Sequence, residues 1–396
     1  MGQALPIGLV SVALPALFRQ NGLPLELFWV FAIPLIPGWL RWAIALVVDN
    51  KGLHSFGFRK CWIAPCTLLG ALLYLWVSQL SPVPEYLWLI LTLLTSKSII
   101  MTAQDVAVDG WVVESLEHHE RTTGASIVVF LSFLGTVTAQ GLVASVDAVG
   151  WTAAMTVAAV LLIAVALPAM FRPEPPQPEA AQRRRTNNRS ASIWTFIRGS
   201  NVPMVLVFLV VAGFGSNLLR SMLPVFLVDI NLSLLEIGVV FSIGTLIGVS
   251  GAALLAPRLT RTWGIQRSVI FTLANYPICG ALFIWMSQHA SMTVFNVACV
   301  LVYAMAVSTM MWMLVTDARI RWSSKAQAAT DFSVMASVSN FGEWMGATVA
   351  GFAVVALGWS WFFTAGWGIN VISALIFVLL LGANVGSSNK PKLADR

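Results

Sequence analysis

Residues 86–113 read YLWLILTLLTSKSIIMTAQDVAVDGWVV, an apolar run long enough to cross a membrane that contains three charged side chains. A membrane-spanning helix needs about 20 predominantly apolar residues, and a charge at its centre costs about 2.5–3.5 kcal/mol. Lys97, Asp105 and Asp109 therefore predict a helix with one face turned toward protein or water rather than lipid. A chain that contains such a helix is expected to bury that face among other spans.

The composition of the whole chain also indicates a membrane protein. Of its 396 residues, 58% are hydrophobic and only 10% are charged, whereas soluble domains carry roughly 25% charged residues. The net charge of +6 does not call for nucleic acid as a partner, because Lys and Arg gather on the cytoplasmic side of membrane proteins. The four cysteines and four histidines show neither disulfide nor zinc spacing, so we expect no metal and no cofactor.

The apolar runs predict an all-α polytopic membrane protein with twelve spans in two halves of six. Residues 172–200, between the halves, are rich in Pro, Gln, Ser and Arg, which is typical of a flexible cytoplasmic linker. The expected domains are residues 1–171, this linker, and residues 201–396 with a short cytoplasmic tail. The expected spans are 1–18, 25–48, 61–80, 86–113, 124–147, 150–171, 202–229, 233–256, 268–288, 291–317, 328–356 and 359–383.

The distribution of Lys and Arg sets the expected orientation. With both termini in the cytoplasm, Arg19 is the only one of the 23 that falls in an outside loop, and Arg41, Lys97 and Arg220 lie within spans. The remaining 19 gather on the inside, as the positive-inside rule requires.

The two halves are similar to each other in one segment. Residues 13–31, ALPALFRQNGLPLELFWVF, resemble residues 222–241, MLPVFLVDINLSLLEIGVVF, with one extra residue in the second. Each has Leu-Pro near the end of a span, a short polar turn and a Leu-rich start to the next span. Six plus six spans, a weak repeat and a central linker favour the major facilitator architecture, in which the halves rock around a midplane site.

The charged residues of residues 86–113 are the first candidate functional side chains. Lys97 lies near the middle of the span and is the candidate for contact with substrate. Asp105 and Asp109 are four residues apart and share a helix face, so both look away from lipid. Asp105 is expected to serve coupling or helix–helix bonding, and Asp109 a cytoplasmic gate. An ion pair with a loop arginine or a helix cap is an equal alternative for Asp109.

Two other spans add cations. Arg41 and Arg220 are, together with Lys97, expected to bind substrate, and two or three cations within spans favour an anionic solute. Arg220 lies in GFGSNLLRSMLP, where the glycines and Pro224 predict an interrupted helix.

Carboxylates and tryptophans within spans complete the candidate site. Glu343 and Asp105 are candidate proton carriers, because burial favours the protonated form of a carboxyl group. The alternative, that they are structural counter-ions of the cations, stays open. Trp312, like Trp39 and Trp344, can stack on a flat solute, with helix packing as the alternative.

The loop after the second span carries a candidate gate. It reads RWAIALVVDNKGLHSFGFRKCWI, in which Asp49 at a helix end precedes the basic pair Arg59 and Lys60. These charges can clamp neighbouring helices in one arrangement and release them in another.

The chain resembles one branch of the major facilitator superfamily, which contains the AmpG-type muropeptide permeases, the acetyl-coenzyme A transporters and the RhtX/FptX-type siderophore permeases. Four features carry the resemblance: QALPIGLVSVALPALFRQNG (3–22), Pro37 with Arg41 and Asp49, FGFRKCW (56–62), and above all QDVAVDGW (104–111). The last is similar to a Gln-Asp-x-x-x-Asp signature. The compact form with the segment ALPALFRQ is most similar to the siderophore importers.

The resemblance implies a proton-coupled importer of a ferric siderophore or similar anionic solute in a bacterial inner membrane. A muropeptide or acetyl-coenzyme A permease, or an exporter, is the alternative within transport. A polytopic enzyme or a receptor without transport is the alternative from another class, although the sequence has no nucleophile–base pair and no Gly-rich phosphate loop. The expected partners are the solute, protons and the lipid bilayer, with the chain as a monomer.

The first span is short for a membrane crossing. Met1 to Phe18 gives about 27 Å of helix, against a hydrocarbon core of about 30 Å. Gln3 and Pro6 fall early in it. We therefore expect that further apolar residues precede Met1 in the natural protein.

Overall fold

The structure is all-helical. The computed structural model of the chain describes residues 9–50, 59–115, 121–171, 197, 201–289, 292–322 and 328–382, and no strand occurs among them. The predicted linker, apart from residue 197, and the tail after residue 382 lie outside this part. The helices are η1 (Leu9–Ala13), α2 (Leu14–Gln20), η2 (Leu25–Leu35), α3 (Ile36–Trp39), α4 (Arg41–Asn50), α5 (Lys60–Ser78), η3 (Pro84–Tyr86), α6 (Leu87–Ser115), α7 (Arg121–Phe171), α10 (Val202–Asp229), α11 (Leu234–Ile243), η4 (Gly244–Val249), α12 (Ser250–Ser287), α13 (Val294–Trp322) and α14 (Ala328–Gly382).

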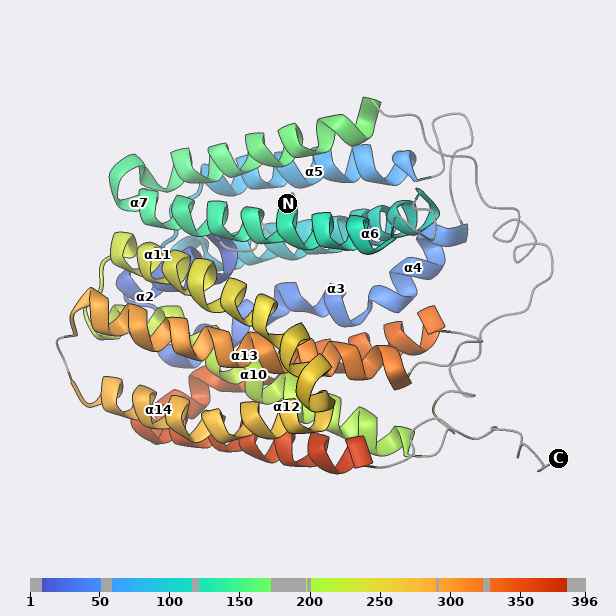
Figure 1. The fold of residues 1–396 in the computed structure, drawn as a ribbon. Coiled ribbons are helices and arrows are strands. Elements are labelled where there is room, and N and C mark those ends of the chain that lie inside the picture. Colours follow the sequence, from blue (N-terminus) through green and yellow to red (C-terminus); the bar gives the residue numbers. More distant parts are fainter. Residues whose placement is uncertain are drawn as a thin grey trace.

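Three of the long helices contain a glycine at which the chain turns back. Gly150, Gly264 and Gly358 have φ angles of 83°, 78° and 69°, a region that favours glycine. Figure 1 shows the reversal within α7 clearly. Eight described segments are long and apolar enough to cross a membrane. Divided at these glycines they become eleven, and η1 with α2 adds another, in agreement with the predicted twelve spans.

One predicted loop is helical in the structure. The residues after the eighth span, from Pro257 on, were expected to form a basic loop, but α12 continues as a helix to the break at Gly264. Arg258 and Arg261 therefore lie on a helix rather than in a loop. Long basic side chains can lie along a helix and extend to water, so their charge does not end a span.

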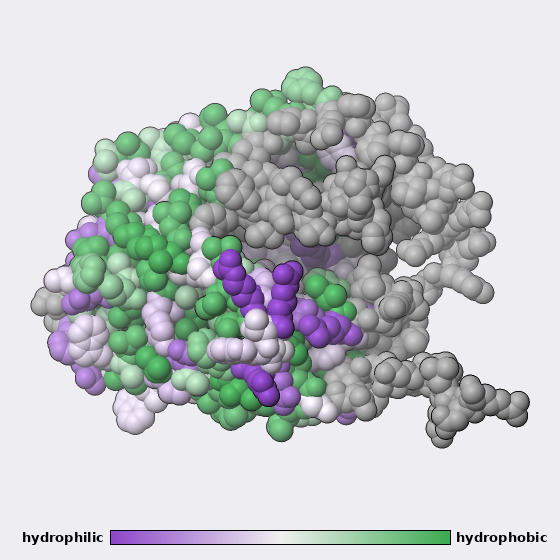
Figure 2. All heavy atoms as spheres, viewed as in Figure 1, coloured by the Kyte–Doolittle hydropathy of each residue, from purple (hydrophilic) through white to green (hydrophobic). Residues whose placement is uncertain are grey.

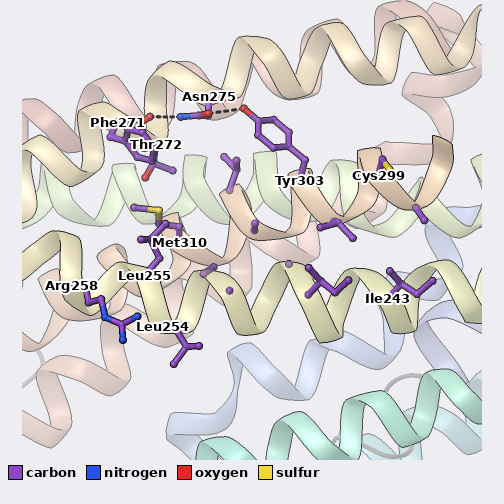
Figure 3. Close-up of a pocket in the computed structure, with 18 of the residues that line it drawn as sticks. Ile243, Leu254, Leu255, Arg258, Phe271, Thr272, Asn275, Cys299, Tyr303 and Met310 are labelled. Carbon is purple, nitrogen blue, oxygen red and sulfur yellow. Dashed lines mark hydrogen bonds between the residues drawn. The ribbon is translucent and has the colours of Figure 1, made fainter. Parts of the chain in front are cut away.

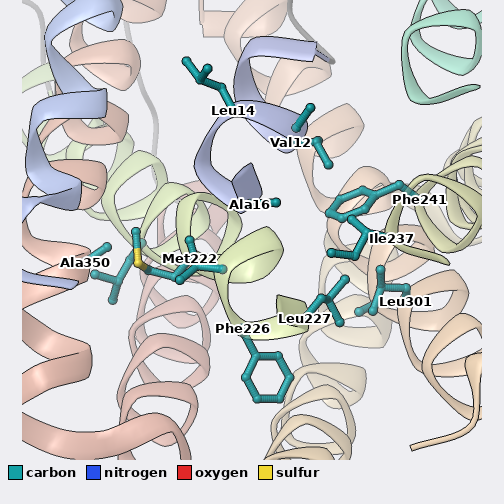
Figure 4. Close-up of a cluster of buried hydrophobic side chains, with 14 of the residues drawn as sticks. Val12, Leu14, Ala16, Met222, Phe226, Leu227, Ile237, Phe241, Leu301 and Ala350 are labelled. Carbon is teal, nitrogen blue, oxygen red and sulfur yellow. The ribbon is translucent and has the colours of Figure 1, made fainter. Parts of the chain in front are cut away.

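The two halves are joined at one end of the bundle, which we call the closed end. It contains Gln20, Gly150, Asp229 and Gly358, and lies at the left of Figure 1. Here α2 packs on α10, α7 packs on α11, and η2 packs on α14. Buried apolar side chains of all these helices fill the interface. Figure 4 shows part of this cluster, in which Val12 and Ala16 face the side chains of α10 and α11.

Two carboxylates reinforce the closed end. Arg19 donates to both oxygens of Asp229 from the other half, at 2.6 and 3.1 Å, and the indole N–H of Trp359 donates to the same carboxylate at 3.0 Å. Asp147 accepts the backbone N–H of Leu235, at the start of α11, at 2.9 Å. A carboxylate at a helix N-terminus is favourable because the first N–H groups lack partners within the helix. Arg19, the expected outside cation, thus ties the halves together.

The surface over α11, α12 and α13 is largely apolar. Figure 2 shows hydrophobic side chains over much of the described part of this face, and a group of hydrophilic side chains beside the grey region. Ile247, Leu254 and Phe295 are 60%, 65% and 75% exposed. Large exposed side chains of this kind are expected where a helix meets lipid rather than water.

One of the close helix crossings lies between α10 and α14. Gly342 and Gly346 form a Gly-x-x-x-Gly spacing on α14, and a Cβ added to either would overlap a backbone carbonyl of α10. Gly213 on α10 meets the carbonyl of Ser339 in the same way. Small residues at such a spacing let helix backbones approach in a membrane, where packing rather than hydrophobicity drives association.

We predict that Gly342→Ala and Gly346→Ala destabilise the protein, because each new methyl group would meet backbone rather than a movable side chain. Overpacking of this kind costs about 1–3 kcal/mol. Gly368→Ala, in the part of α14 after the turn at Gly358, is the control, since nothing lies within 4 Å of the added carbon. Thermal unfolding of purified protein in detergent measures the effect. Equal unfolding midpoints for Gly346→Ala and Gly368→Ala would contradict the crossing.

Candidate functional site

The second span is interrupted, and the interruption shapes the site. Its first part, η2, is a 3₁₀ helix, followed by the short α3 and then α4, with Pro34 and Pro37 at the irregular positions. Irregular backbone within a membrane needs hydrogen-bond partners from neighbouring helices. The Ser98 hydroxyl donates to the Pro34 carbonyl at 2.6 Å, and the Asn340 amide donates to the Gly38 carbonyl at 3.1 Å. The second span is therefore held on one side by α6 and on the other by α14.

The first charged pair joins α4 to α6. The guanidinium of Arg41 donates to the carboxylate of Asp105, and the two side chains are 35% and 24% exposed. Arg41 follows directly after the break in the second span, which turns it toward α6. Sequence reasoning identified both residues but assigned Arg41 to substrate and left a counter-ion role open for Asp105. The geometry supports the counter-ion alternative in this conformation.

Lys97 occupies a different environment. Its ammonium nitrogen lies 5.0 Å from the centre of the Tyr74 ring on α5, an arrangement that stabilises a cation by cation–π attraction. Among the described residues no carboxylate lies within ion-pair distance of it. Tyr74 is fully buried, and its hydroxyl has no hydrogen-bond partner within that part of the chain. Lys97 therefore faces α5 inside the first half, rather than joining Arg41 or Arg220.

The second charged pair joins α10 to α14. Arg220 Nη2 lies 3.4 Å from Glu343 Oε2, and Arg220 Nε donates to Asn217 Oδ1 at 3.0 Å. The Asn217 amide donates in turn to the backbone carbonyl of Glu343 at 2.8 Å. The Arg220 side chain is 71% exposed. A charged group this exposed within a span is expected to face water rather than lipid.

The interrupted helix that was predicted around Arg220 is not observed, because α10 is continuous from Val202 to Asp229. Pro224 lies inside it and costs one hydrogen bond without breaking the helix. Gly213 serves the close crossing with α14, and Gly215 lies against Asn370 and Ile369 of the same helix. The glycines thus allow packing rather than bending.

Aromatic side chains lie beside the second pair, where the halves meet. The Trp39 ring is 5.6 Å from that of Phe341 and 6.2 Å from that of Trp344, the neighbour of Glu343. Phe341 and Trp344 stack on each other at 5.8 Å. The indole N–H of Trp39 is buried without a partner among the described residues. The cluster joins α3 to α14, so the packing alternative for these tryptophans applies in this conformation.

The remaining predicted residues lie apart from these pairs. Trp312 is 62% exposed on α13 and makes no ring contact with another described aromatic side chain. Arg59 is buried and Lys60 half-buried at the start of α5. Asp49 and Asp109 lie on α4 and α6, which pack together, but their side chains lie outside the described residues. The structure thus places the predicted gate on adjoining helices.

Sequence reasoning missed three features of the site. Asn217 and Asn340 were not singled out, although each lies one turn from Arg220 or Glu343 and a polar side chain at that spacing is a usable signal. The Gly-x-x-x-Gly spacing of Gly342 and Gly346 was a third available signal.

The two charged pairs are suited to reversible binding of ions rather than to covalent chemistry. Two acid–cation pairs lie on membrane-spanning helices, and each is partly exposed. A charged solute or a proton can replace one member of such a pair. No group of His, Cys, Asp and Glu that could hold a metal ion occurs in the part of the chain that the structure describes.

Comparison with proteins of known structure gives the same fold. The nucleoside transporter NupG is 14% identical with a TM-score of 0.74, covering 97% of both chains. A bacterial homologue of the human lysosomal transporter Spinster, inward-facing and unoccupied, is 15% identical with a TM-score of 0.70, covering 96% of this chain and 95% of that one. A D-xylose-proton symporter is 13% identical with a TM-score of 0.69, covering 98% and 97%. At these identities the likeness shows the fold alone.

Comparison of the sequence shows the family. Uncharacterized protein C21B10.09 of Schizosaccharomyces pombe is 29% identical over 146 residues, which cover 33% of this chain and only 27% of that protein. The model of the Major Facilitator Superfamily matches residues 2–319, most of the chain. The chain therefore belongs to the Major Facilitator Superfamily, as predicted.

Proposed function

We propose that the protein is a proton-coupled secondary transporter that moves a small anionic organic solute across a bacterial inner membrane by alternating access. Arg220 binds the solute and Glu343 carries the proton, at the crossing of α10 and α14 within the second half. Arg41 and Asp105 form a second pair that can open to the same pathway. Membership of a transporter family and the partly exposed charged pairs within spans support this proposal.

The state of Arg220 is the observation that carries the proposal. Its guanidinium is largely exposed, and its contact with Glu343 is long for an ion pair with hydrogen-bond geometry. An anion can therefore approach Arg220 without first removing a tightly bound carboxylate. Arginine is suited to this role because its planar fork matches carboxylate and phosphate groups. Asn217 Oδ1 accepts a further hydrogen bond from Nε of the same guanidinium.

Proton coupling follows from competition for Arg220. When an anion binds the guanidinium, Glu343 loses its cationic partner. Loss of a nearby cation favours the protonated form of a carboxyl group. Solute binding and proton uptake are then linked, as symport requires. A protein of similar fold is named as a D-xylose-proton symporter, which supports proton coupling in this architecture.

Alternating access requires the contacts at the closed end to break and re-form. The Arg19–Asp229 pair and the Asp147 cap on α11 join the halves there. We assign the closed end to the outside and the opposite end to the cytoplasm, because the described basic residues Arg258, Arg261, Arg319 and Arg321 lie toward the latter. Asp49, Arg59, Lys60 and Asp109 form the cytoplasmic gate in this proposal.

Within this class we favour a siderophore, on the resemblance carried by ALPALFRQ and QDVAVDGW. A muropeptide and an acyl-coenzyme A are the alternatives, and all three are anionic. The aromatic side chains of Trp39, Phe341 and Trp344 offer stacking surfaces for a flat solute once the halves part. Trp312, exposed on α13, is a further candidate for stacking.

We predict that Arg220→Gln lowers uptake by weakening solute binding about tenfold or more, the value of a lost hydrogen bond to a charged group. Uptake of a labelled ferric siderophore, a muropeptide and an acyl-coenzyme A into proteoliposomes measures it. Arg321→Gln is the control, because Arg321 pairs with Asp317 on α13 and lies outside the site. Uptake by Arg220→Gln equal to that of the control would remove Arg220 from the site.

We predict that Glu343→Gln abolishes concentrative uptake but preserves exchange of labelled for unlabelled solute. Glutamine keeps an acceptor for Arg220 but cannot carry the proton. The two assays use the same proteoliposomes, with and without an imposed proton gradient. Asp105→Asn tests the second pair in the same way. Wild-type accumulation that survives a protonophore would show that protons do not drive transport.

A further inference from the structure

A groove on the membrane-facing side of the second half has no role in the proposed transport. It lies between α11–η4–α12 and the part of α12 after Gly264, with α13 as its floor, and has a volume of about 840 Å³. Figure 3 shows Arg258 at one end and Ile243 and Cys299 at the other. Several of its lining side chains are among the most exposed apolar groups of the described chain, including Ile247, Leu254 and Phe295.

The wall of the groove offers almost nothing to a polar solute. The Tyr303 hydroxyl donates to Asn275 Oδ1 at 2.5 Å, and the Asn275 amide donates to the Phe271 carbonyl at 2.7 Å. These polar groups therefore satisfy each other, as the dashed lines of Figure 3 show. The rest of the lining is apolar apart from Thr272, Cys299 and Arg258. Such a surface fits a hydrocarbon chain.

Arg258 gives the groove one charged end. Its side chain lines the groove and is exposed, one and a half turns before the break at Gly264. Trp263 and Phe271 form a ring pair at 5.8 Å near this end. Tryptophan is enriched at the level of lipid headgroups, and basic side chains at that level attract anionic lipids. We therefore expect the guanidinium of Arg258 to lie at the depth of the phosphate groups of the lipids.

We propose that the groove binds one acyl chain of an anionic glycerophospholipid, whose phosphate pairs with Arg258. The lining residues of α11–η4–α12 run from Ile243 to Arg258, about 22 Å at 1.5 Å per residue. One leaflet of a membrane has a hydrocarbon depth of about 15 Å, half of the core. The groove is thus long enough for a whole acyl chain that starts at Arg258.

The lipid site is separate from the proposed solute site. On α13 the groove is floored by Ala298, Val302 and Ala306. Trp312 is six residues beyond Ala306, which turns it about 120° away around the helix. Arg220 and Glu343 lie on α10 and α14, neither of which lines the groove. A bound lipid would therefore touch α12 and α13 without occupying the solute pathway.

Native mass spectrometry of the detergent-purified protein, titrated with phosphatidylglycerol or with phosphatidylcholine of the same chains, tests the proposal. We expect wild-type protein to retain one phosphatidylglycerol about fivefold more tightly, the effect of one basic residue near an anionic lipid. Arg258→Gln should abolish this preference. Arg321→Gln, on α13 and outside the groove, should keep the preference for phosphatidylglycerol.

A second variant tests the acyl chain itself. Cys299 is exposed at the end of the groove opposite Arg258, so Cys299→Trp should obstruct that end and reduce retention of both lipids, whereas Cys299→Ser should not. Equal retention of the two lipids by wild-type protein, or a preference that survives Arg258→Gln, would overturn the proposal. A doubled mass that is lost in Cys299→Trp would give the groove to a second copy of the chain and overturn it as well.

Discussion

The close approach of α10 and α14 is the constraint on which the rest of the site depends. Gly213, Gly342 and Gly346 let the two backbones touch, and this contact sets Arg220 opposite Glu343. In lipid no hydrophobic force holds helices together, so the crossing relies on packing and on the bonds through Asn217. The opposite face of α14, two residues away from the glycines, carries Asn340 and Trp344 and turns them toward the other half.

The ion pairs differ in strength, and we assign the strong one to holding helices together and the weak one to binding solute. Arg19 binds Asp229 through two hydrogen bonds in a partly buried setting, which suits a contact that holds the closed end. Arg220 meets Glu343 through one long contact in an exposed setting, which suits a pair that changes partners. Bidentate pairs are the stronger of the two kinds. The two-bond geometry of Arg19–Asp229 thus agrees with a structural role, and the single long contact of Arg220–Glu343 agrees with a role in transport.

The sequence predicted the fold well because the membrane fixes the length of each span, and α10 has the predicted bounds of 202–229. It also located Arg41, Asp105, Arg220 and Glu343, since a charge within an apolar run stands out. It could not predict their pairing, because a partner on another span depends on helix rotation and crossing. Lys97 shows this limit: its partner is the ring of Tyr74, and no spacing pattern marks an aromatic face. The basic residues after the eighth span predicted a loop, but Arg258 and Arg261 lie on the helix, because basic side chains do not by themselves end one.

The central claim is that an anion and Glu343 compete for Arg220, so that solute binding takes up a proton. Calorimetric titration of the transported solute in buffers of different ionisation enthalpy measures the number of protons taken up. Linkage requires an uptake of up to one proton per solute for wild-type protein, and about none for Glu343→Gln. The same proton number in wild type and in Glu343→Gln would contradict the account.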